Sequence, residues 1–324
     1  MKICFLDNIE ISYTAEDLSS SKIRGAENIL INLSNQLSIL GHQVTIYNNC
    51  LQDRIINNIR WMNLNNIDQD FVYDLALTNN DIRLFDKVKA KKYVAFSHSI
   101  QTIEKFIRKR QLISYLKYRP KVVLISSYHN KNRSLLLKMF GSIKLEWAVD
   151  LLFLKTNLND DIIENRAIFT SRNDRNLEML IDIWKKYIFS SNKSAKLFVT
   201  PTSLIYNKYN IYTRKLADKN VLIQDILKSK VFLVPGHKGE LFCLAAEEAR
   251  ELCVPIVTLG IGSLSERVQH GATGFVAKSP KEFAYFTLKI LNDNNLWQTL
   301  RNNLISLRGS KTWDKVALNL IDNV

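Results

Sequence analysis

The stretch that most constrains the fold is residues 231–277, which reads as strand, turn, helix, strand and glycine-rich loop. The run 231–234 is apolar and ends at a Pro-Gly pair, as expected of a buried parallel strand and its exit turn. A helix is expected over about 241–252, and a second apolar strand over 253–257. Six of the ten glycines lie between Gly236 and Gly274, so the backbone can approach a ligand closely here. The pattern predicts a strand-helix-strand unit with a binding loop.

Two glutamates flank the start of the expected helix. Glu240 lies at the loop-to-helix junction, and Glu248 lies about two turns further on, rotated by roughly 80° around the helix axis. Because they do not lie one above the other, they can hold different parts of one elongated ligand. The first N–H groups of the helix, which lie between them, form an anion site. Carboxylates for hydroxyls and N–H groups for a diphosphate together suggest a nucleotide-sugar.

Residues 240–249, ELFCLAAEEA, resemble the E-x-F-G-L-x-x-x-E-A motif of the retaining family-4 glycosyltransferases, which have the GT-B fold. One departure is Cys243, which replaces the usual glycine and is expected to narrow the sugar pocket. The alternative is an ordinary strand-helix-strand crossover with surface glutamates, since the spacing of the two glutamates alone is common. The family's continuation is matched by these downstream residues: Pro255, Ile256, Val257, Gly262, Glu266, Gly271, Gly274 and Phe275.

The resemblance implies an α/β fold of two Rossmann-like domains, with parallel sheets facing a central cleft. Residues 1–155 would form the acceptor domain, with 311–324 packing back on it, and 156–310 would bind the nucleotide-sugar. The implied enzyme is a retaining hexosyltransferase that needs no metal or other cofactor. It would move a sugar from a nucleotide-diphosphate donor, UDP favoured over GDP, to a saccharide or lipid-linked glycan in cell-surface polysaccharide or lipopolysaccharide-type synthesis. In this reading Glu240 holds sugar hydroxyls and Glu248 holds the ribose hydroxyls.

Cations for the donor diphosphate are expected in the loop that follows a strand at 167–171. Arg172 and Arg175 lie there, and guanidinium groups bind phosphate oxygens in pairs. The loop resembles the family's G-R…K-G element, with Arg175 where the lysine is expected. The alternative is a solvated loop in which Arg172 pairs with Asp174. Further donor contacts are expected from these residues: His237, Gly239, Leu241, Phe242, Cys243 and Leu244.

The first domain contributes two further candidates. Arg24 and Gly25 precede an amphipathic helix and resemble a G-G-A-E-type loop that approaches the donor phosphate; otherwise they are a simple helix start. His98 directly follows an expected strand at 93–96, and ligand sites in parallel sheets lie beyond such strand ends. It could relay a proton near the acceptor, although a lone histidine is more often structural. The candidate catalytic residues are Glu240, His98, Arg172 and Arg175.

Composition limits the partners and the compartment. The chain carries 45 Lys and Arg against 31 Asp and Glu, a net charge of +14, which implies an anionic partner. No helix-turn-helix, RNA-binding or zinc signature supports a nucleic-acid partner. Residues 1–7 lack a signal peptide and no apolar run spans a membrane, so we expect a cytoplasmic protein. The four cysteines form no CxxC pair and are expected to be reduced core thiols.

Residues 105–121 carry seven cations and no acid, with aromatic and aliphatic residues between them. A basic amphipathic helix of this kind is typical of peripheral attachment to the inner face of an anionic membrane. The alternative is a helix packed on the first domain with a solvated basic face. For the whole chain, the alternative to an enzyme is a non-catalytic protein, derived from a transferase, that binds a nucleotide-sugar or an anionic polymer.

Overall fold

The computed structural model describes residues 1–19, 23–158, 164–202, 207–215 and 218–324. Contacts divide the chain into two compact units, one of Met1–Trp147 with Thr312–Val324 and the other of Ala148–Lys311. The sequence analysis placed the boundary after residue 155. Residues 159–163, next to that expected boundary, lie outside the described residues.

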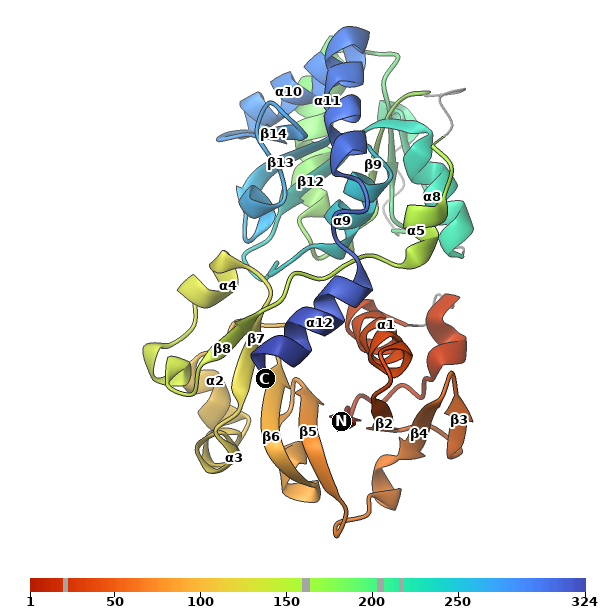
Figure 1. Ribbon diagram of the computed structural model, residues 1–324. Helices are drawn as coiled ribbons and strands as arrows, with labels where there is room; N and C mark the ends of the chain where they lie inside the picture. The colour runs from red at the N-terminus through yellow and green to blue at the C-terminus, as the bar shows by residue number, and fades with distance from the viewer. Residues whose placement is uncertain (20–22, 159–163, 203–206, 216–217) are drawn as a thin grey trace. The chain divides into compact units, whose positions relative to one another are not determined.

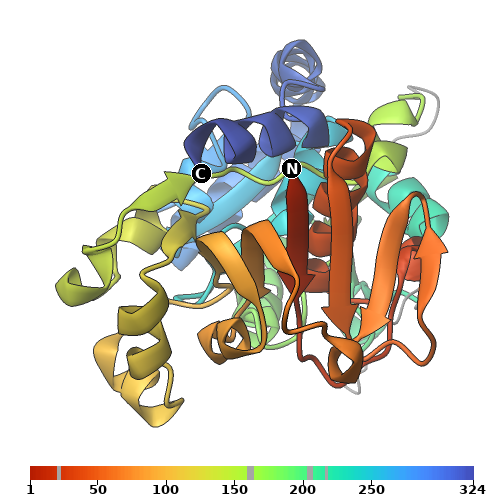
Figure 2. The ribbon, with the colours of Figure 1, turned by 60° about the horizontal axis from the view of Figure 1, so that its bottom comes forward.

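The first unit is built on an eight-stranded sheet in the order β3-β4-β2-β1-β5-β6-β7-β8, counted over the described residues (Figures 1 and 2). Neighbouring strands are parallel except β3 and β4, which pair antiparallel. The strands are β1 (Lys2–Leu6), β2 (Gln43–Asn48), β3 (Arg54–Ile56), β4 (Ile59–Asn63), β5 (Val72–Asn79), β6 (Lys89–Phe96), β7 (Lys121–Leu124) and β8 (Ser142–Lys144). Strand order reverses direction between β1 and β5, as in doubly wound sheets.

Helices of the first unit follow the predicted apolar periodicity. In α1 (Gly25–Ile39) the buried face includes Ile29, Leu33 and Leu37, and Gly41 ends the helix at φ +83°. The last helix, α12 (Trp313–Asn323), packs against α1, and Trp313 stacks on Trp147 with ring centroids 6.1 Å apart (Figure 2). The remaining helices are η1 (Ala15–Ser19), η2 (Leu64–Asn66), η3 (Ile82–Lys87), α2 (Ile103–Arg108), α3 (Leu112–Tyr118), α4 (Ser127–Lys131) and η4 (Leu135–Lys138).

The second unit is built on a parallel sheet in the order β11-β10-β9-β12-β13-β14, within the described residues. The strands are β9 (Glu164–Phe169), β10 (Lys196–Val199), β11 (Ile211–Thr213), β12 (Ser229–Gly236), β13 (Ile256–Ile261) and β14 (Gly274–Val276). The helices are α5 (Leu151–Lys155), α6 (Leu177–Ile183), the π-helical η5 (Trp184–Ile188), α7 (Phe189–Ser191), η6 (Asn207–Tyr209), α8 (Lys219–Leu227), α9 (Leu244–Glu251), η7 (Leu264–Glu266), α10 (Pro280–Asn292) and α11 (Asn294–Leu307).

Both faces of this second sheet are buried, which explains its continuous apolar strands. Along β12, Val231 and Leu233 join the core cluster that contains residues of α6, α10 and α11, while Phe232 and Val234 join the cluster with α5, α8 and α9. Alternate residues therefore bury into opposite layers, as the two-residue period of a strand requires. The result is a three-layer unit whose sheet edges carry the loops.

Several expectations at the level of single elements were wrong. The helix expected from residue 241 begins at Leu244, and the expected basic helix 105–121 is two short helices, α2 and α3, separated at 109–111. Residue Arg110, in that break, has φ +55°, which no α-helix accommodates. The cysteine prediction is confirmed, since all four thiols are free and buried. No helix among the described residues is both long enough and apolar enough to cross a membrane.

Candidate active site

The candidate site of the second unit lies where its strand order reverses. From β9 the chain moves outward to β10 and β11, then returns to β12 on the other side of β9 and continues to β13 and β14. The loops that leave the carboxyl ends of β9 and β12 must therefore diverge to opposite faces, and ligands of open parallel sheets bind in the crevice this creates. Those two loops carry Arg172, Arg175, His237 and Glu240.

Glu240 lies in a turn before α9 and not in the helix. Its backbone N–H donates to the carbonyl of His237 at 2.8 Å, and its own carbonyl accepts the N–H of Ser263 at 2.9 Å. One carboxylate oxygen accepts the N–H of Cys243 at 3.0 Å. Burial raises the pKa of Glu240, and the positive charge of Arg175 and this N–H bond act in the opposite direction. The backbone of Glu240 is thus held on both sides. One carboxylate oxygen is held by the N–H of Cys243, and the other faces Arg175.

Arg175 and His237 complete the contact between the two loops. The Arg175 Nε lies 3.8 Å from a Glu240 oxygen, and its Nη1 lies 3.1 Å from Nδ1 of His237. The same Nδ1 is 3.0 Å from the backbone nitrogen of Gly239. Because both neighbours of Nδ1 are N–H donors, Nδ1 must be the acceptor, and the ring is neutral with its proton on Nε2. His237 therefore presents an N–H donor away from Arg175.

Two glycines allow this close approach of the loops. A Cβ on Gly262 would lie 2.5 Å from the carbonyl oxygen of His237 and 2.7 Å from that of Glu240, and its φ is +78°. A Cβ on Gly239 would lie 3.1 Å from the His237 ring. The side chain of Asn176 also donates to the carbonyl of Gly236, which ties the loop after β9 directly to the end of β12. The glycine-rich pattern thus reflects backbone packing around Glu240.

Cys243 occupies the N-cap of α9 with φ +66° and ψ +78°, a left-handed conformation that favours glycine. Its side chain is buried, at 4% exposure, and burial raises the pKa of its thiol. The helix begins at Leu244, and the N–H groups of Ala246 and Glu247 donate to the carbonyl of Cys243 at 3.1 and 3.3 Å. The N–H groups of Leu244 and Ala245 precede these bonds, at the positive end of the helix where anions bind. Leu241 and Phe242 are buried beside them.

Arg172 is arranged as in the solvated-loop alternative. Its Nε and Nη2 donate to the two carboxylate oxygens of Asp174 at 3.0 and 2.6 Å, and both side chains are exposed. Asp174 also lies 3.9 Å from Nε of Arg175. The predicted pair of free phosphate-binding arginines is therefore one arginine facing Glu240 and one bound by a neighbouring acid.

Glu248 lies on α9, about one turn beyond its first residue, and is half-buried. Burial raises the pKa of Glu248 to about 7; the ammonium of Lys219 lowers it and the carboxylate of Asp150 raises it. Lys219 itself donates to Asp150 at 2.6 Å. Since Glu240 precedes the helix, the rotation of 80° expected between the two glutamates does not apply. As expected, the two carboxylates still lie at separate points, Glu240 in the loop and Glu248 on the helix.

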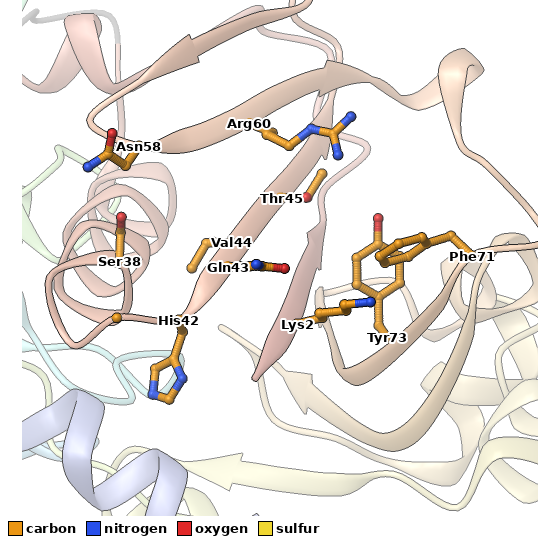
Figure 3. Close-up of a pocket in the computed structure, with 11 residues that line it drawn as sticks. Lys2, Ser38, His42, Gln43, Val44, Thr45, Asn58, Arg60, Phe71 and Tyr73 are labelled. Atoms are coloured by element: carbon orange, nitrogen blue, oxygen red, sulfur yellow. The ribbon is translucent and has the colours of Figure 1, made fainter.

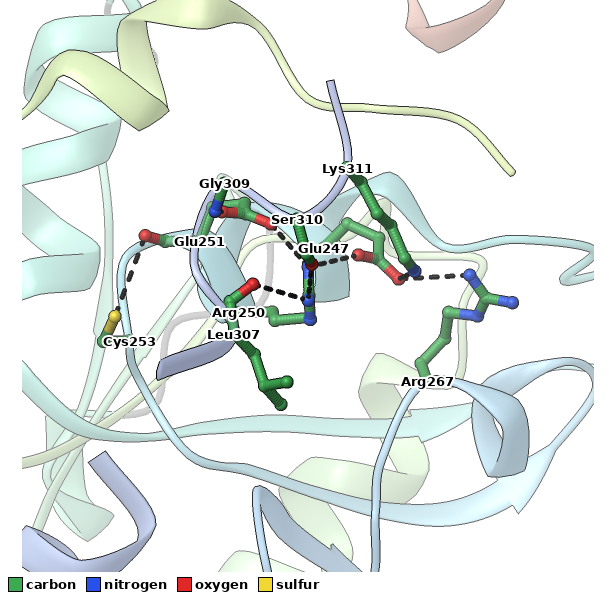
Figure 4. A network of polar contacts seen from close by, with 9 residues as sticks. All are labelled: Glu247, Arg250, Glu251, Cys253, Arg267, Leu307, Gly309, Ser310 and Lys311. Atoms are coloured by element: carbon green, nitrogen blue, oxygen red, sulfur yellow. Dashed lines mark hydrogen bonds and ion pairs between the residues drawn. The ribbon is translucent and has the colours of Figure 1, made fainter. Parts of the chain in front are cut away.

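A buried network of ion pairs fixes α9 to the residues that pack against it (Figure 4). Glu247, 2% exposed in its side chain, lies 3.1 Å from both Arg267 and Lys311 and 3.5 Å from Arg250. Arg250 in turn contacts Glu251 at 2.5 Å and Ser310 at 2.7 Å. Arg267 also lies over the ring of Phe242, 4.6 Å from its centre. The network therefore fixes the position of the helix whose first turn belongs to the candidate site.

The candidates of the first unit lie at its carboxyl strand ends. Arg24 and Gly25 are exposed at the start of α1, where the Arg24 N–H donates to Glu27 at 2.8 Å. His98 follows β6 and is half-buried, with its backbone N–H held by the side chain of Asn80 at 2.9 Å. The structure thus groups Arg175, His237, Gly239, Glu240 and Cys243, while Arg24, Gly25 and His98 belong to the other unit.

A protein-family model matches part of the second unit. Residues 212–306 match the family model described as "Glycosyl transferases group 1". We call these residues the group 1 segment. No curated protein sequence matches the chain significantly. The group 1 segment contains His237, Glu240 and Glu248 and ends before α12, whereas Arg172 and Arg175 precede it.

Solved structures show the fold of the whole chain. A sucrose-phosphate synthase from Thermosynechococcus elongatus is 14% identical, with a TM-score of 0.70 over 100% of this chain and 98% of the other. HepE from Anabaena, in complex with UDP and glucose, is 15% identical, with a TM-score of 0.70 over 100% and 99%. WaaG, a glycosyltransferase involved in lipopolysaccharide biosynthesis, is 11% identical, with a TM-score of 0.64 over 99% of each chain. The predicted GT-B fold is confirmed.

Sequence analysis missed a polar cluster at the strand-order reversal of the first unit. Asp7, just after β1, accepts the O–H of Tyr13 at 2.6 Å and the side-chain N–H of Asn79 at 3.1 Å. Burial raises the pKa of Asp7, although both hydrogen bonds lower it. The signal was available, since Asp7 and Asn79 end neighbouring strands on the two sides of that reversal. His129, on α4, is wholly buried, and burial lowers its pKa to about 4.

The first unit also has a pocket of about 450 Å³ at the opposite edge of its sheet (Figure 3). Lys2 and Gln43, the first residues of β1 and β2, line it together with Arg60, Phe71 and Tyr73. The Lys2 ammonium lies 4.9 Å from the centre of the Phe71 ring. Because this is the amino edge of parallel strands, it is remote from the edge where His98 lies, and the group 1 segment contributes nothing to it.

Proposed function

We propose that this protein is a retaining glycosyltransferase that moves a sugar from a UDP-sugar to a saccharide or lipid-linked glycan in the synthesis of a cell-surface polysaccharide. The observation that carries the proposal is the group of Glu240, Arg175, His237 and the first turn of α9 at the strand-order reversal of the second unit. It combines a fixed carboxylate, a cation, a neutral N–H donor and the backbone N–H groups at the start of a helix. The complexes of HepE with UDP and with UDP-glucose support a UDP donor.

The chemical problem in this reaction is the negative charge that the diphosphate gains as it leaves. Arg175 and the N–H groups that begin at Leu244 offer a cation and aligned dipoles in fixed positions, which stabilise that charge without reorganisation. The proton of His237 Nε2 adds a third donor type. Since these positive groups belong to the chain, the proposed reaction needs no metal ion.

The two carboxylates divide the recognition of the donor. Glu240 accepts hydrogen bonds from sugar hydroxyls, because its position before the helix places it beside Arg175 and the phosphate groups. Glu248, further along α9, accepts from the ribose hydroxyls. In the proposed step the acceptor oxygen attacks the anomeric carbon from the face that the diphosphate leaves. The carbon–oxygen bond to the phosphate breaks, and the acceptor proton passes to the departing phosphate oxygen, so configuration is retained.

The test is a donor screen followed by a turnover assay. Thermal unfolding with UDP, UDP-glucose, UDP-galactose, UDP-N-acetylglucosamine and GDP-mannose identifies the donor, since a ligand at 100 times its dissociation constant stabilises by about 2.7 kcal/mol. Release of UDP and the anomeric configuration of the product are then measured with glycan acceptors. Glu240→Gln should bind UDP but lose turnover, while Glu178→Gln, an exposed change on α6, serves as the control. An inverted product would refute the retaining mechanism.

The second candidate function is binding without turnover, which the buried Cys243 at a glycine-favouring position supports. Its side chain occupies space beside Glu240 that a glycine would leave open. Under this alternative, nucleotide-sugars stabilise the protein but no acceptor yields UDP. Cys243→Gly then distinguishes a blocked site from a site of another purpose, because only the former gains turnover.

A further inference from the structure

The first unit leaves a group of large apolar side chains uncovered around α2, α3 and η4. Ile113 and Leu135 are 81% and 82% exposed, and Ile107 and Met139 are each 59% exposed. Leu116 and Leu136 are also exposed. We call these six residues, with the cations Arg108, Lys109 and Arg110, the basic apolar surface. In Figures 1 and 2, α2 and α3 project from the part of the sheet that contains β6 and β7.

The exposed side chains are not needed for the packing of these helices. Phe106 and Tyr115, both buried, meet edge to face with ring centroids 5.4 Å apart, and Tyr115 lies 5.1 Å from Phe140. The Tyr115 hydroxyl donates to the carbonyl of Leu137 at 2.7 Å, which joins α3 to η4. Separate residues thus form the core of this substructure, and α2 and α3 pack on the first unit with an exposed basic face, as the alternative in the sequence analysis expected. The outward residues remain available for another apolar phase.

Charge on the same segments selects the kind of partner. Residues 105–121 contain seven cations and no acid. Lys117 is paired with Asp86 at 2.7 Å, and Lys121 donates to the carbonyl of Asn323. Arg108, Lys109 and Arg110 make no ion pair within the described part of the chain, and all three are exposed. Unpaired cations beside exposed aliphatic side chains match a surface that is anionic outside and apolar within.

We propose that the basic apolar surface binds an anionic phospholipid bilayer, with Ile113, Leu135 and their neighbours inserted at the interface and Arg108, Lys109 and Arg110 among the lipid phosphates. Each cation near an anionic leaflet adds about 1 kcal/mol of attraction. Each inserted aliphatic side chain adds hydrophobic binding energy, which salt does not screen. The inference deepens the proposed function, since such a surface holds the enzyme where a lipid-linked acceptor lies. Bilayer binding itself does not require turnover.

The experiment is co-sedimentation of the whole chain with vesicles of phosphatidylcholine alone and with added phosphatidylglycerol, at low and high salt. Wild type should bind only the anionic vesicles, and more weakly at high salt. Arg108→Glu/Lys109→Glu/Arg110→Glu should lower the partition coefficient at least about 100-fold. Ile113→Ser/Leu135→Ser should lower it about tenfold or more at both salt concentrations. The matched control is Lys278→Glu/Lys281→Glu/Lys289→Glu, which makes the same charge change at exposed positions of the second unit.

Each outcome decides the proposal. Failure of wild type to bind anionic vesicles overturns it, and so does an equal loss in the control, which would indicate net charge alone. Binding to heparin is measured with and without vesicles. If the protein binds heparin equally in both conditions, and Ile113→Ser/Leu135→Ser does not change this binding, the partner is a soluble polyanion and not a bilayer. UDP binding is measured in every variant. Retained UDP binding shows that the second unit of a variant is folded and separates failure of this surface from failure of the donor site.

Discussion

The ion pair between Arg172 and Asp174 predicts how the donor site can be strengthened. If Arg172 binds the donor diphosphate, it must first leave Asp174, whose carboxylate now occupies both its Nε and Nη2 donors. Asp174→Asn removes the competing charge while keeping the size of the side chain. We therefore expect Asp174→Asn to bind UDP more tightly than wild type, and Arg172→Ala to bind it more weakly.

The exposure of the pair sets the size of both effects. The side chains of Arg172 and Asp174 are 63% and 60% exposed, and an ion pair of this kind is worth about 0.2–1 kcal/mol. Its loss should lower the dissociation constant of UDP by a factor of about 1.4 to 5. A charge-assisted hydrogen bond is worth about 1.5–3 kcal/mol, so Arg172→Ala should raise the same constant about 10- to 150-fold.

The assay is calorimetric titration of UDP into wild type, both single variants and the double variant. Competition for Arg172 requires that Asp174→Asn has no effect once Arg172 is alanine, because Arg172 is then no longer present to be released. If Asp174→Asn tightens binding equally in both backgrounds, Asp174 acts by repelling the phosphates and the release argument is refuted. If Arg172→Ala binds UDP as wild type does, Arg172 lies outside the donor site.

Three further predictions test the site and its support. Since Glu248 has a pKa raised to about 7 and must be ionised to accept ribose hydroxyls, UDP affinity should fall as the pH drops below 7, by up to about tenfold per pH unit; titrations in Glu248→Gln should show no such change between pH 6 and 8. Glu247→Ala breaks the buried ion pair between Glu247 and Arg267 and should lower the unfolding free energy in urea by about 3–5 kcal/mol, against little change for the exposed control Glu178→Ala. Transfer should persist in excess EDTA, and its loss on chelation with recovery in Mn²⁺ would contradict a diphosphate site made of protein cations alone.

The general placement of the second-unit site could be predicted because it depends on strand ends. The apolar runs at 167–169 and 231–234 identify neighbouring parallel strands, and the residues that follow such strands meet at one sheet edge. That argument needs no side-chain detail, and it brings Arg175 near Glu240. The GT-B fold, in contrast, was implied by the resemblance of residues 240–249 and the motif that follows them to the family-4 glycosyltransferases.

The start of α9 could not be predicted from periodicity. Leu241, Phe242 and Leu244 continue the apolar pattern of the helix, yet the first two belong to a turn. The turn forms because Cys243 adopts φ +66° and donates its N–H to Glu240, a conformation that a sequence without glycine at this position does not announce. The helix is therefore three residues shorter than expected. Glu240 lies outside it, so helix geometry does not set its position relative to Glu248.

In the loop after β9, the charged residues could be predicted from the sequence, but their ion-pair partners could not. A loop with Arg172, Asp174 and Arg175 contains two cations and one acid, and composition cannot say which cation the acid takes. In the structure Asp174 is bidentate to Arg172 and only 3.9 Å from Arg175, whose guanidinium is instead held between His237 and Glu240. Arg175 is fixed by groups from another strand end and Arg172 by a residue of its own loop. Arg175 is thus positioned before any ligand binds, whereas Arg172 is exchangeable, and the two should contribute differently to affinity and to turnover.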